Sequence, residues 1–283
     1  MTRYFLIILF SMFLVSCEDT NIAVMTDAAT DAVTAITLSD EDVKNLAQSA
    51  VQVSDSEHRV APTGNPYDTR LRMLVADHSQ RDGISFNFKA YLTKDVNAFA
   101  MADGSIRIFT GLMDLMNDEE LLFVIGHEMG HVVMNHSRKK VRLAYSTSAL
   151  RKGLAAQENQ IGQVASSVIG SFAEQLTHAQ FSQHEERQAD IYGADFLERE
   201  GYGISSAVSA LKKLADLANN HTFLSSHPDP EARAMRIIQR ENGTGEDQDS
   251  LFKKVFQYVQ DIVTGLLTLI SHLLKWVMSL LPV

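Results

Sequence analysis

Cysteine is nearly absent from this chain of 283 residues, which contains one, Cys17. A single cysteine excludes a disulfide within the chain, so this residue has a different role or none. Basic residues are also few: 25 lysines and arginines face 35 aspartates and glutamates, for a formal net charge of -10 at pH 7. Proteins that bind phosphate backbones usually carry a basic face. The composition therefore predicts no nucleic-acid partner.

The N-terminus lacks an apolar run long enough to span a bilayer. Tyr4 to Val15 is apolar but short, and it follows the positive Arg3, as in an export signal. The run ends in Leu-Val-Ser-Cys at residues 14–17, which resembles the lipobox of bacterial lipoproteins. We therefore expect a lipoprotein signal peptide over 1–17 and a lipid on Cys17. That lipid would anchor a periplasm-facing protein in the cell envelope, in the outer membrane rather than the inner. An ordinary secretory signal is the alternative.

The remaining chain has no internal repeat, and its length suits one domain with appendages. Residues 18–38 lack a periodic apolar pattern and are expected to form a flexible tether. Residues 39–245 are expected to form one α+β domain, mainly helical with a small β-sheet. The patterns predict helices that begin near 40, 67, 117, 181, 205 and 231, the third reaching about 140, and strands over 87–92 and 105–109.

A linker and an amphipathic helix are expected over residues 246–283. Over 251–283 apolar side chains recur at alternating spacings of four and three, with polar residues on the other side. Such a helix could lie on a membrane surface, dock onto the domain or mediate self-association. A spanning helix is less favoured, because His272 and Lys275 would fall inside the membrane.

The clearest chemical motif is His-Glu-Met-Gly-His, from His127 to His131, within a strongly apolar helical segment. Histidines four residues apart share one face of a helix, so both imidazoles can bind one zinc ion. Glu128 lies beside them, within reach of a water molecule at the metal. Unpartnered core histidines would be costly in such a segment, which favours a metal site.

Catalytic zinc usually takes three protein ligands. The third histidine of metzincins is absent, since Ser137 occupies its position and His136 is rotated off the ligand face. Glu186 and Asp190 share one face of a later helix, so Glu186 can bind zinc while Asp190 accepts a hydrogen bond from a ligand imidazole. The competing Glu185 points about a hundred degrees away. We therefore predict one zinc ion per chain.

Further motifs occur around this site in a workable order. They are Asn97-Ala98-Phe99-Ala100, Ala189-Asp190 with Gly193, Gly201-Tyr202, and Ser226-His227-Pro228 followed by Arg233. With the zinc motif they resemble the HtpX and CAAX-prenyl-endopeptidase superfamily, particularly its small periplasmic lipoprotein members, over about residues 60–240. Unlike HtpX itself, the chain lacks two strong spanning helices ahead of the zinc motif.

The resemblance implies a gluzincin-type zinc endopeptidase, with zinc on the two motif histidines and Glu186, and with Glu128 as catalytic acid and base. It also places His227 by the active site. There His227 could stabilise the oxyanion as a catalytic group, or it could occupy the water position and close the site. Arg233 is expected to hold the loop of His227 by pairing with an acid that the sequence does not identify.

An extended substrate could add to an edge strand that includes Asn97, Ala98 and Phe99, although an ordinary core strand fits the pattern equally well. The expected substrates are misfolded, unfolded or membrane-associated proteins. Two other functions remain as alternatives. One is a non-catalytic, chaperone-like envelope factor with a structural zinc, against which Glu128 argues because a structural site needs no acid or base. The other is a membrane-anchored scaffold that acts through the C-terminal helix.

Overall fold

The protein is represented by a computed structural model, which describes residues 38–147, 166–217 and 222–243. The expected signal peptide, lipidation site, C-terminal helix and nearly all of the tether lie outside these residues. No helix in the described part is both long and apolar enough to cross a membrane. The chain divides into two units, Met1–Ile237 and Ile238–Val283, and the first contains every described element except the last turn of the final helix.

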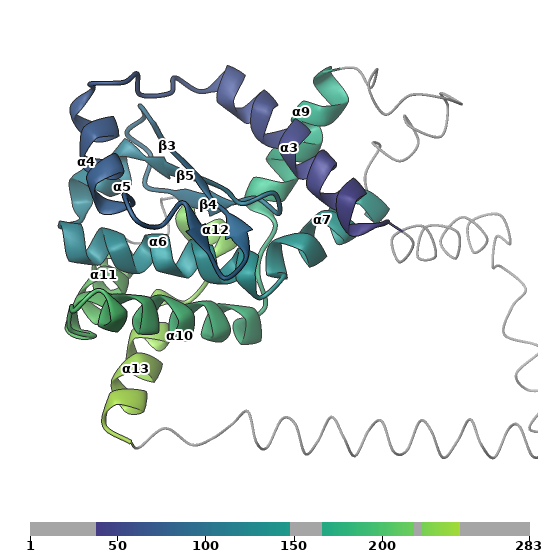
Figure 1. Cartoon of the computed structure of the whole chain (residues 1–283). Coiled ribbons are helices and arrows are strands. Elements are labelled where there is room, and N and C mark those ends of the chain that lie inside the picture. The colour runs from purple at the N-terminus through teal and green to yellow at the C-terminus, as the bar shows by residue number, and fades with distance from the viewer. Residues whose placement is uncertain (1–37, 148–165, 218–221, 244–283) are drawn as a thin grey trace, which may run out of the picture. The chain divides into compact units, whose positions relative to one another are not determined.

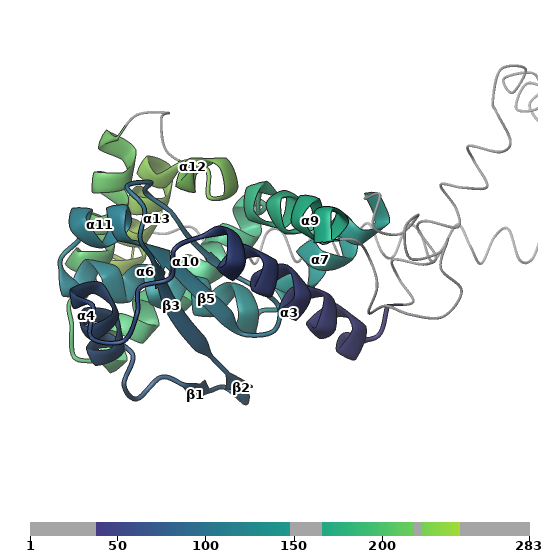
Figure 2. The ribbon, with the colours of Figure 1, turned by 90° about the horizontal axis from the view of Figure 1, so that it is seen from above.

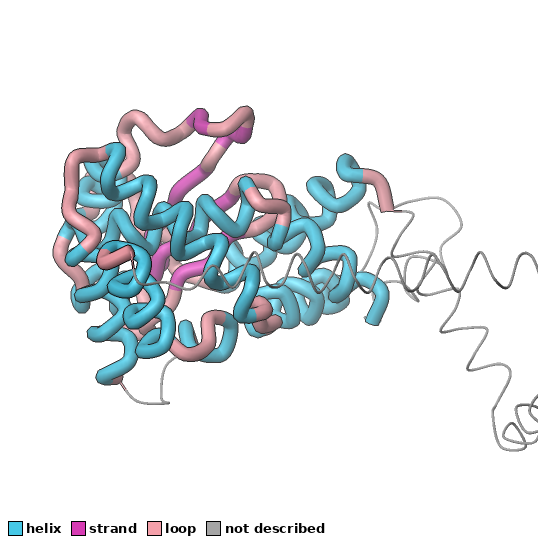
Figure 3. Tube along the Cα trace, turned by 90° about the horizontal axis from the view of Figure 1, so that it is seen from below, coloured by secondary structure: helices cyan, strands magenta, loops and turns pink. Residues whose placement is uncertain are grey.

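Most described elements are helices, as the sequence predicts, and the strands are short (Figures 1 and 3). The elements are α3 (Asp40–Glu57), α4 (Pro66–Leu74), β1 (Gln80–Arg81), β2 (Ile84–Ser85), β3 (Asn87–Tyr91), β4 (Ala98–Ala100), β5 (Ser105–Phe109), α5 (Thr110–Leu115), α6 (Asp118–Val133), α7 (His136–Thr147), α9 (Ser166–His178), α10 (Gln183–Arg199), α11 (Ser205–Asp216), α12 (Phe223–Ser226) and α13 (Pro230–Glu241).

The main sheet has the order β3-β5-β4, so β4 is an edge strand, one of the two alternatives that the sequence left open. β3 runs parallel to β5, and β4 runs antiparallel to it. Successive side chains of a strand point to opposite faces. Ala90 and Ala98 accordingly join the core cluster on the α6 side, whereas Tyr91 and Phe99 join a second cluster with α3 and α9. The sheet therefore separates two hydrophobic layers.

The first layer contains α6, α10 and α11, and the second contains α3, α7 and α9. In Figure 1, α10 runs beside α6 below the sheet, and Figure 2 shows α3 and α9 side by side on the other side of the molecule. The two motif-bearing helices, α6 and α10, thus belong to one layer. This arrangement brings segments about 60 positions apart in the sequence into direct contact.

A capping box closes the N-terminus of α6, near the predicted start of this helix. The Oδ1 atom of Asn117 accepts a hydrogen bond from the Glu120 amide at 2.9 Å, and the Glu120 carboxylate accepts one from the Asn117 amide at 2.9 Å. The predicted continuation of this helix to about residue 140 is wrong. α6 ends at Val133, and Asn135 adopts the left-handed conformation, with φ of 62°. Asparagine tolerates that region better than most residues, so the chain turns there and α7 begins at His136.

Two glycines allow α6 and α10 to approach closely. A Cβ atom on Gly126 would lie 2.8 Å from the Phe196 ring. A Cβ atom on Gly193 would lie 3.0 Å from the backbone nitrogen of His127. Because neither position carries a side chain, the two backbones come near enough for a short acidic side chain on α10 to reach the histidines of α6.

Candidate metal centre

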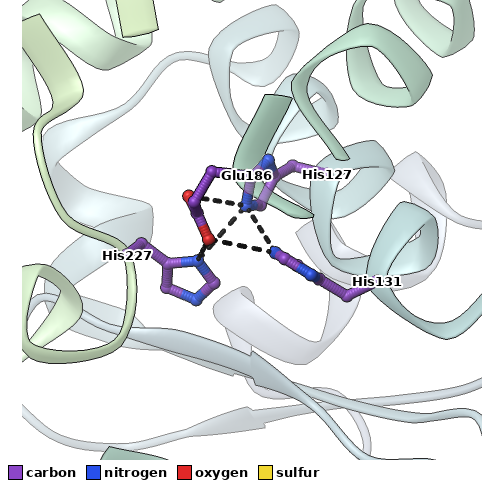
Figure 4. Close-up of side chains that lie close together, drawn as sticks. All are labelled: His127, His131, Glu186 and His227. Carbon is purple, nitrogen blue, oxygen red and sulfur yellow. Dashed lines mark hydrogen bonds and ion pairs between the residues drawn. The ribbon is translucent and has the colours of Figure 1, made fainter. Parts of the chain in front are cut away.

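Four buried side chains converge between α6, α10 and the end of α12. They are His127 and His131 on α6, Glu186 on α10 and His227, the residue that follows α12. One ligand atom from each lies within 4.8 Å of the other three, and each residue is at most 1% exposed. Figure 4 shows the three rings and the carboxylate directed at a common point.

The spacing of these atoms suits a small tetrahedral ion. The Nε2 atoms of His127 and His131 are 3.1 Å apart. The Glu186 carboxylate lies 3.7 Å from the first of them and 3.4 Å from the second. Ligands that bind zinc tetrahedrally at about 2.0–2.2 Å are about 3.3–3.6 Å apart. Two imidazoles and one carboxylate are also a donor set used by catalytic zinc, so the residues fit this metal.

His227 lies at the fourth corner of the same group. Its Nδ1 atom is 3.3 Å from Nε2 of His127 and 3.0 Å from Oε1 of Glu186. The His227 ring stacks on Phe223, with centroids 4.4 Å apart, which orients it toward the centre. The sequence leaves open whether His227 stabilises an oxyanion or closes the site, and in the structure its Nδ1 atom lies among the candidate ligand atoms.

Asp190 and Arg233 lie directly behind His127. The Nδ1 atom of His127 is 3.0 Å from Oδ1 of Asp190. A proton on Nδ1 can be donated to that carboxylate, which leaves Nε2 as the ligand atom. Arg233 donates to both carboxylate oxygens of Asp190, and its Nη1 atom is 2.7 Å from Oε2 of Glu186. The acid partners of Arg233 that the sequence could not identify are therefore Asp190 and Glu186.

The charges around the site favour the protonation states that a metal requires. Burial alone would raise the pKa of Glu186, but the charge of Arg233 and the contacts with His227 and His131 together outweigh burial and hold the pKa well below its usual range. For Asp190 too, burial would raise the pKa, but Arg233 and His127 together outweigh burial and lower the pKa. Burial lowers the pKa of His131 well below its ordinary value. Both carboxyls are therefore ionised and His131 is neutral near pH 7.

Glu128 lies beside the group without a hydrogen bond of its own. It is fully buried, and neither carboxylate oxygen has a hydrogen-bond partner in the described part of the chain. Its Oε1 atom is 3.3 Å from Nε2 of His227. A buried carboxylate without hydrogen bonds lowers the stability of the fold. Such groups occur at functional sites, including sites of proton transfer.

The other predicted residues lie as follows. β4 contains Ala98 and Phe99, and the Asn97 side chain accepts a hydrogen bond from the Ala98 amide at 2.9 Å. Glu185 is turned away from the centre, because its carboxylate caps α10 at Ser182 and pairs with Lys139 at 2.8 Å. The rejection of Glu185 as third ligand therefore agrees with the structure.

Sequence reasoning missed three residues that surround the ring of His131. Phe181 stacks on it, with centroids 3.6 Å apart and an interplanar angle of 17°. His136 and Gln188 form a polar chain behind its Nδ1 atom. The prediction that His136 lies off the ligand face assumed one continuous helix. In the structure Asn135 is left-handed, and the chain turns back there.

Comparison with known proteins agrees with this geometry. Residues 68–241 match the model of peptidase family M48. Metalloprotease LoiP of Escherichia coli (strain K12) is 37% identical over 235 residues, which cover 82% of this chain and 93% of that protein. Metalloprotease YcaL of the same strain is 36% identical over 225 residues, 78% of this chain and 88% of YcaL. The beta-barrel assembly-enhancing protease of that strain is 24% identical over 214 residues, 71% of this chain and 42% of the longer protein.

Proposed function

The chain belongs to peptidase family M48, and from this premise we propose that it is a zinc-dependent endopeptidase of the bacterial cell envelope that acts on misfolded, unfolded or membrane-associated proteins. Family membership and similarity to two metalloproteases over most of the chain make it a metalloendopeptidase. The zinc site rests on one observation, the convergence of four buried ligand atoms beside Glu128.

His127, His131 and Glu186 would hold the metal. A bound zinc ion would polarise the scissile carbonyl and lower the pKa of a water molecule toward about 7. Asp190 keeps the ring of His127 in the orientation that directs Nε2 to the centre, since the two groups are 3.0 Å apart. Arg233 compensates the charge of both carboxylates and so keeps them ionised in a buried site.

Glu128 would transfer the proton. Its two carboxylate oxygens are buried and unbonded within the described residues, so they can accept a proton from the attacking water. The same carboxyl group then donates that proton to the leaving amine, which restores the starting state. A structural zinc needs no such group, so a non-catalytic, chaperone-like role is not favoured.

His227 would close the resting enzyme. Its Nδ1 atom lies where the fourth ligand belongs, 3.3 Å from Nε2 of His127, and its Nε2 atom is 3.3 Å from the base Glu128. A water molecule and a substrate carbonyl need that space. Cleavage therefore requires His227 to move away, and the segment that carries it becomes a gate.

The same segment would control access to the substrate strand. The Phe223 amide donates to the carbonyl oxygen of Val96 at 3.2 Å, on the outer edge of the chain leading into β4. When α12 moves, that carbonyl becomes available to a substrate strand paired along Asn97, Ala98 and Phe99. One displacement would thus free both the metal and the peptide-binding edge.

The cellular location follows from the N-terminus. We propose that a lipid on Cys17 anchors the domain in the envelope, with its active site facing the periplasm. Residues 251–283 would add a membrane-surface contact or a self-association contact through their apolar face. The lipobox-like residues 14–17 and the helical apolar pattern support these two proposals.

Cleavage of an unfolded protein by the full-length, detergent-solubilised chain tests the proposed activity. Glu128→Gln should keep its zinc and lose turnover, because the amide cannot accept the proton. Glu41→Gln, an exposed isosteric change on α3, is the matched control and should cleave normally. Near-normal cleavage by the Glu128→Gln variant would refute the assigned role of this residue.

A further inference from the structure

A second polar chain lies behind the other histidine of the motif. The Nδ1 atom of His131 is 3.1 Å from Nδ1 of His136, and Nε2 of His136 is 3.0 Å from Oε1 of Gln188. His131 is fully buried, and His136 is 5% exposed. Two ring nitrogens at this distance share one proton, so one donates and the other accepts.

A bound metal would set the direction of the chain. A neutral imidazole that binds through Nε2 carries its proton on Nδ1, so His131 would be the donor to His136. The Nδ1 atom of His136 is then the acceptor, and the proton of this ring lies on Nε2. That N–H donates to the amide oxygen of Gln188. Both hydrogen bonds of the chain are made in this arrangement.

The fold supplies each member of the chain for a separate reason. The turn at Asn135 brings His136 back toward α6. Gln188 lies on α10, two positions after the ligand Glu186, so the helix that provides the third ligand also anchors this contact. Phe181 stacks on the His131 ring and sets its plane, but its apolar ring cannot distinguish the two nitrogens. Of these two contacts, only the one with His136 distinguishes the two nitrogens of His131.

We propose that His136 and Gln188 are positioning residues, which hold His131 in the tautomer that presents Nε2 to the metal. They are the uncharged counterpart of Asp190 and Arg233 behind His127. The inference rests on the proposed function for the presence of a metal centre, but it does not require that the chain cleaves peptides.

The affinity for zinc, measured by competition with a fluorescent chelator, tests this proposal. His136→Leu keeps the volume but removes the acceptor, and it should weaken binding about 10- to 100-fold. His136→Asn places an amide oxygen near the position of Nδ1 and should restore most of the affinity. Equal affinity in the Leu variant and the wild type, or equal losses in the two variants, would overturn the proposal.

A double-mutant cycle then tests the role of Gln188. Gln188→Met removes the outer acceptor. The double variant with His136→Leu should lose no more zinc affinity than His136→Leu alone. Additive losses of affinity would show that Gln188 acts independently of His136 and would overturn the proposed chain of hydrogen bonds.

Side-chain ¹⁵N spectra of the zinc-bound protein give a readout apart from cleavage. His131 should carry its proton on Nδ1, and that proton should show coupling to the Nδ1 nitrogen of His136 across the hydrogen bond. A proton on Nδ1 of His136, or no coupling between the two rings, would overturn the proposal. A wild type that binds zinc without cleaving protein would refute the proposed function and leave these measurements valid.

Discussion

Arg233 and Asp190 form a two-point ion pair directly behind the metal centre. The Nε atom of Arg233 is 2.9 Å from Oδ2 of Asp190, and Nη2 is 2.6 Å from Oδ1. The remaining nitrogen reaches Glu186 at 2.7 Å. One buried guanidinium thus compensates both the carboxylate that would bind the metal and the carboxylate that orients His127. Assembly of the site therefore depends on the position of α13.

Loss of Arg233 should destabilise the metal-free protein strongly. Arg233→Ala leaves two buried carboxylates without their counter-ion and should lower the free energy of unfolding by about 3–5 kcal/mol. Arg233→Lys keeps the charge but not the planar fork, so its cost should be smaller. Denaturant unfolding measures both. The control is Arg72→Ala, which breaks an exposed pair with Asp68 and should change the free energy of unfolding little. Equal effects at positions 233 and 72 would contradict the account.

A side chain at Gly193 should separate α6 from α10. The added Cβ atom of Gly193→Ala would lie 3.0 Å from the His127 backbone nitrogen, which moves only with its helix. We expect weaker zinc binding and lower stability despite the better helix propensity of alanine. Gly170→Ala on α9 is the control, since its nearest contact is 3.4 Å, and it should stabilise by up to about 1 kcal/mol. Unfolding curves and zinc titrations measure these effects. Higher stability in both alanine variants would refute the argument that Gly193 permits the close approach of the two helices.

The sequence was sufficient for the parts of this protein that depend on local spacing. The histidine pair, the helix starts near residues 40 and 117, and both longer strands follow from local patterns that the structure confirms. The family resemblance drawn from the ordered motifs is confirmed by the match to family M48. These features need only neighbours within a few positions.

The parts that depend on long-range packing were beyond such reasoning. Helical spacing shows that Glu186 and Asp190 share a face, but not which arginine approaches them from α13. The continuation of α6 was mispredicted because one residue, Asn135, takes a left-handed conformation that apolar periodicity does not reveal. The contact between His136 and His131 was missed for the same reason.

Asp55 should make stability depend on pH in the acid range. Burial alone would raise its pKa, but hydrogen bonds from Arg107, Lys89 and Tyr91 outweigh burial and lower the pKa from 3.8 to about 2. Its stabilising contribution, roughly 2 kcal/mol, is therefore present above pH 4 and is lost as the pH falls through about 2. In urea unfolding, Asp55→Asn should have a lower free energy of unfolding than the wild type at pH 7. This difference should become smaller below pH 4.

The exposed Asp95→Asn is the control for this change and should match the wild type within about 0.5 kcal/mol at each pH. A deficit of Asp55→Asn that stays constant between pH 7 and pH 2.5 would show that the carboxylate charge is not what stabilises this contact.

Removal of the His227 ring should activate the enzyme. If the closed form is favoured by about 1.4 kcal/mol, His227→Ala should raise cleavage about tenfold at saturating zinc, because the open fraction is no longer limiting. The alternative role, stabilisation of the oxyanion, would instead make this variant slower by about 10²–10³. Steady-state cleavage of a labelled unfolded protein separates the two, and a slower variant would contradict closure by His227.

The zinc content of two neighbouring glutamate variants tests the central claim most directly. Glu186→Gln changes the expected third ligand, and Glu185→Gln makes the same substitution one position earlier, on a side chain that pairs with Lys139 instead. After dialysis against a weak chelator, the wild type and Glu185→Gln should each retain one zinc per chain, and Glu186→Gln should retain almost none. A full equivalent of zinc in Glu186→Gln, or none in the wild type, would contradict the metal centre described for this protein.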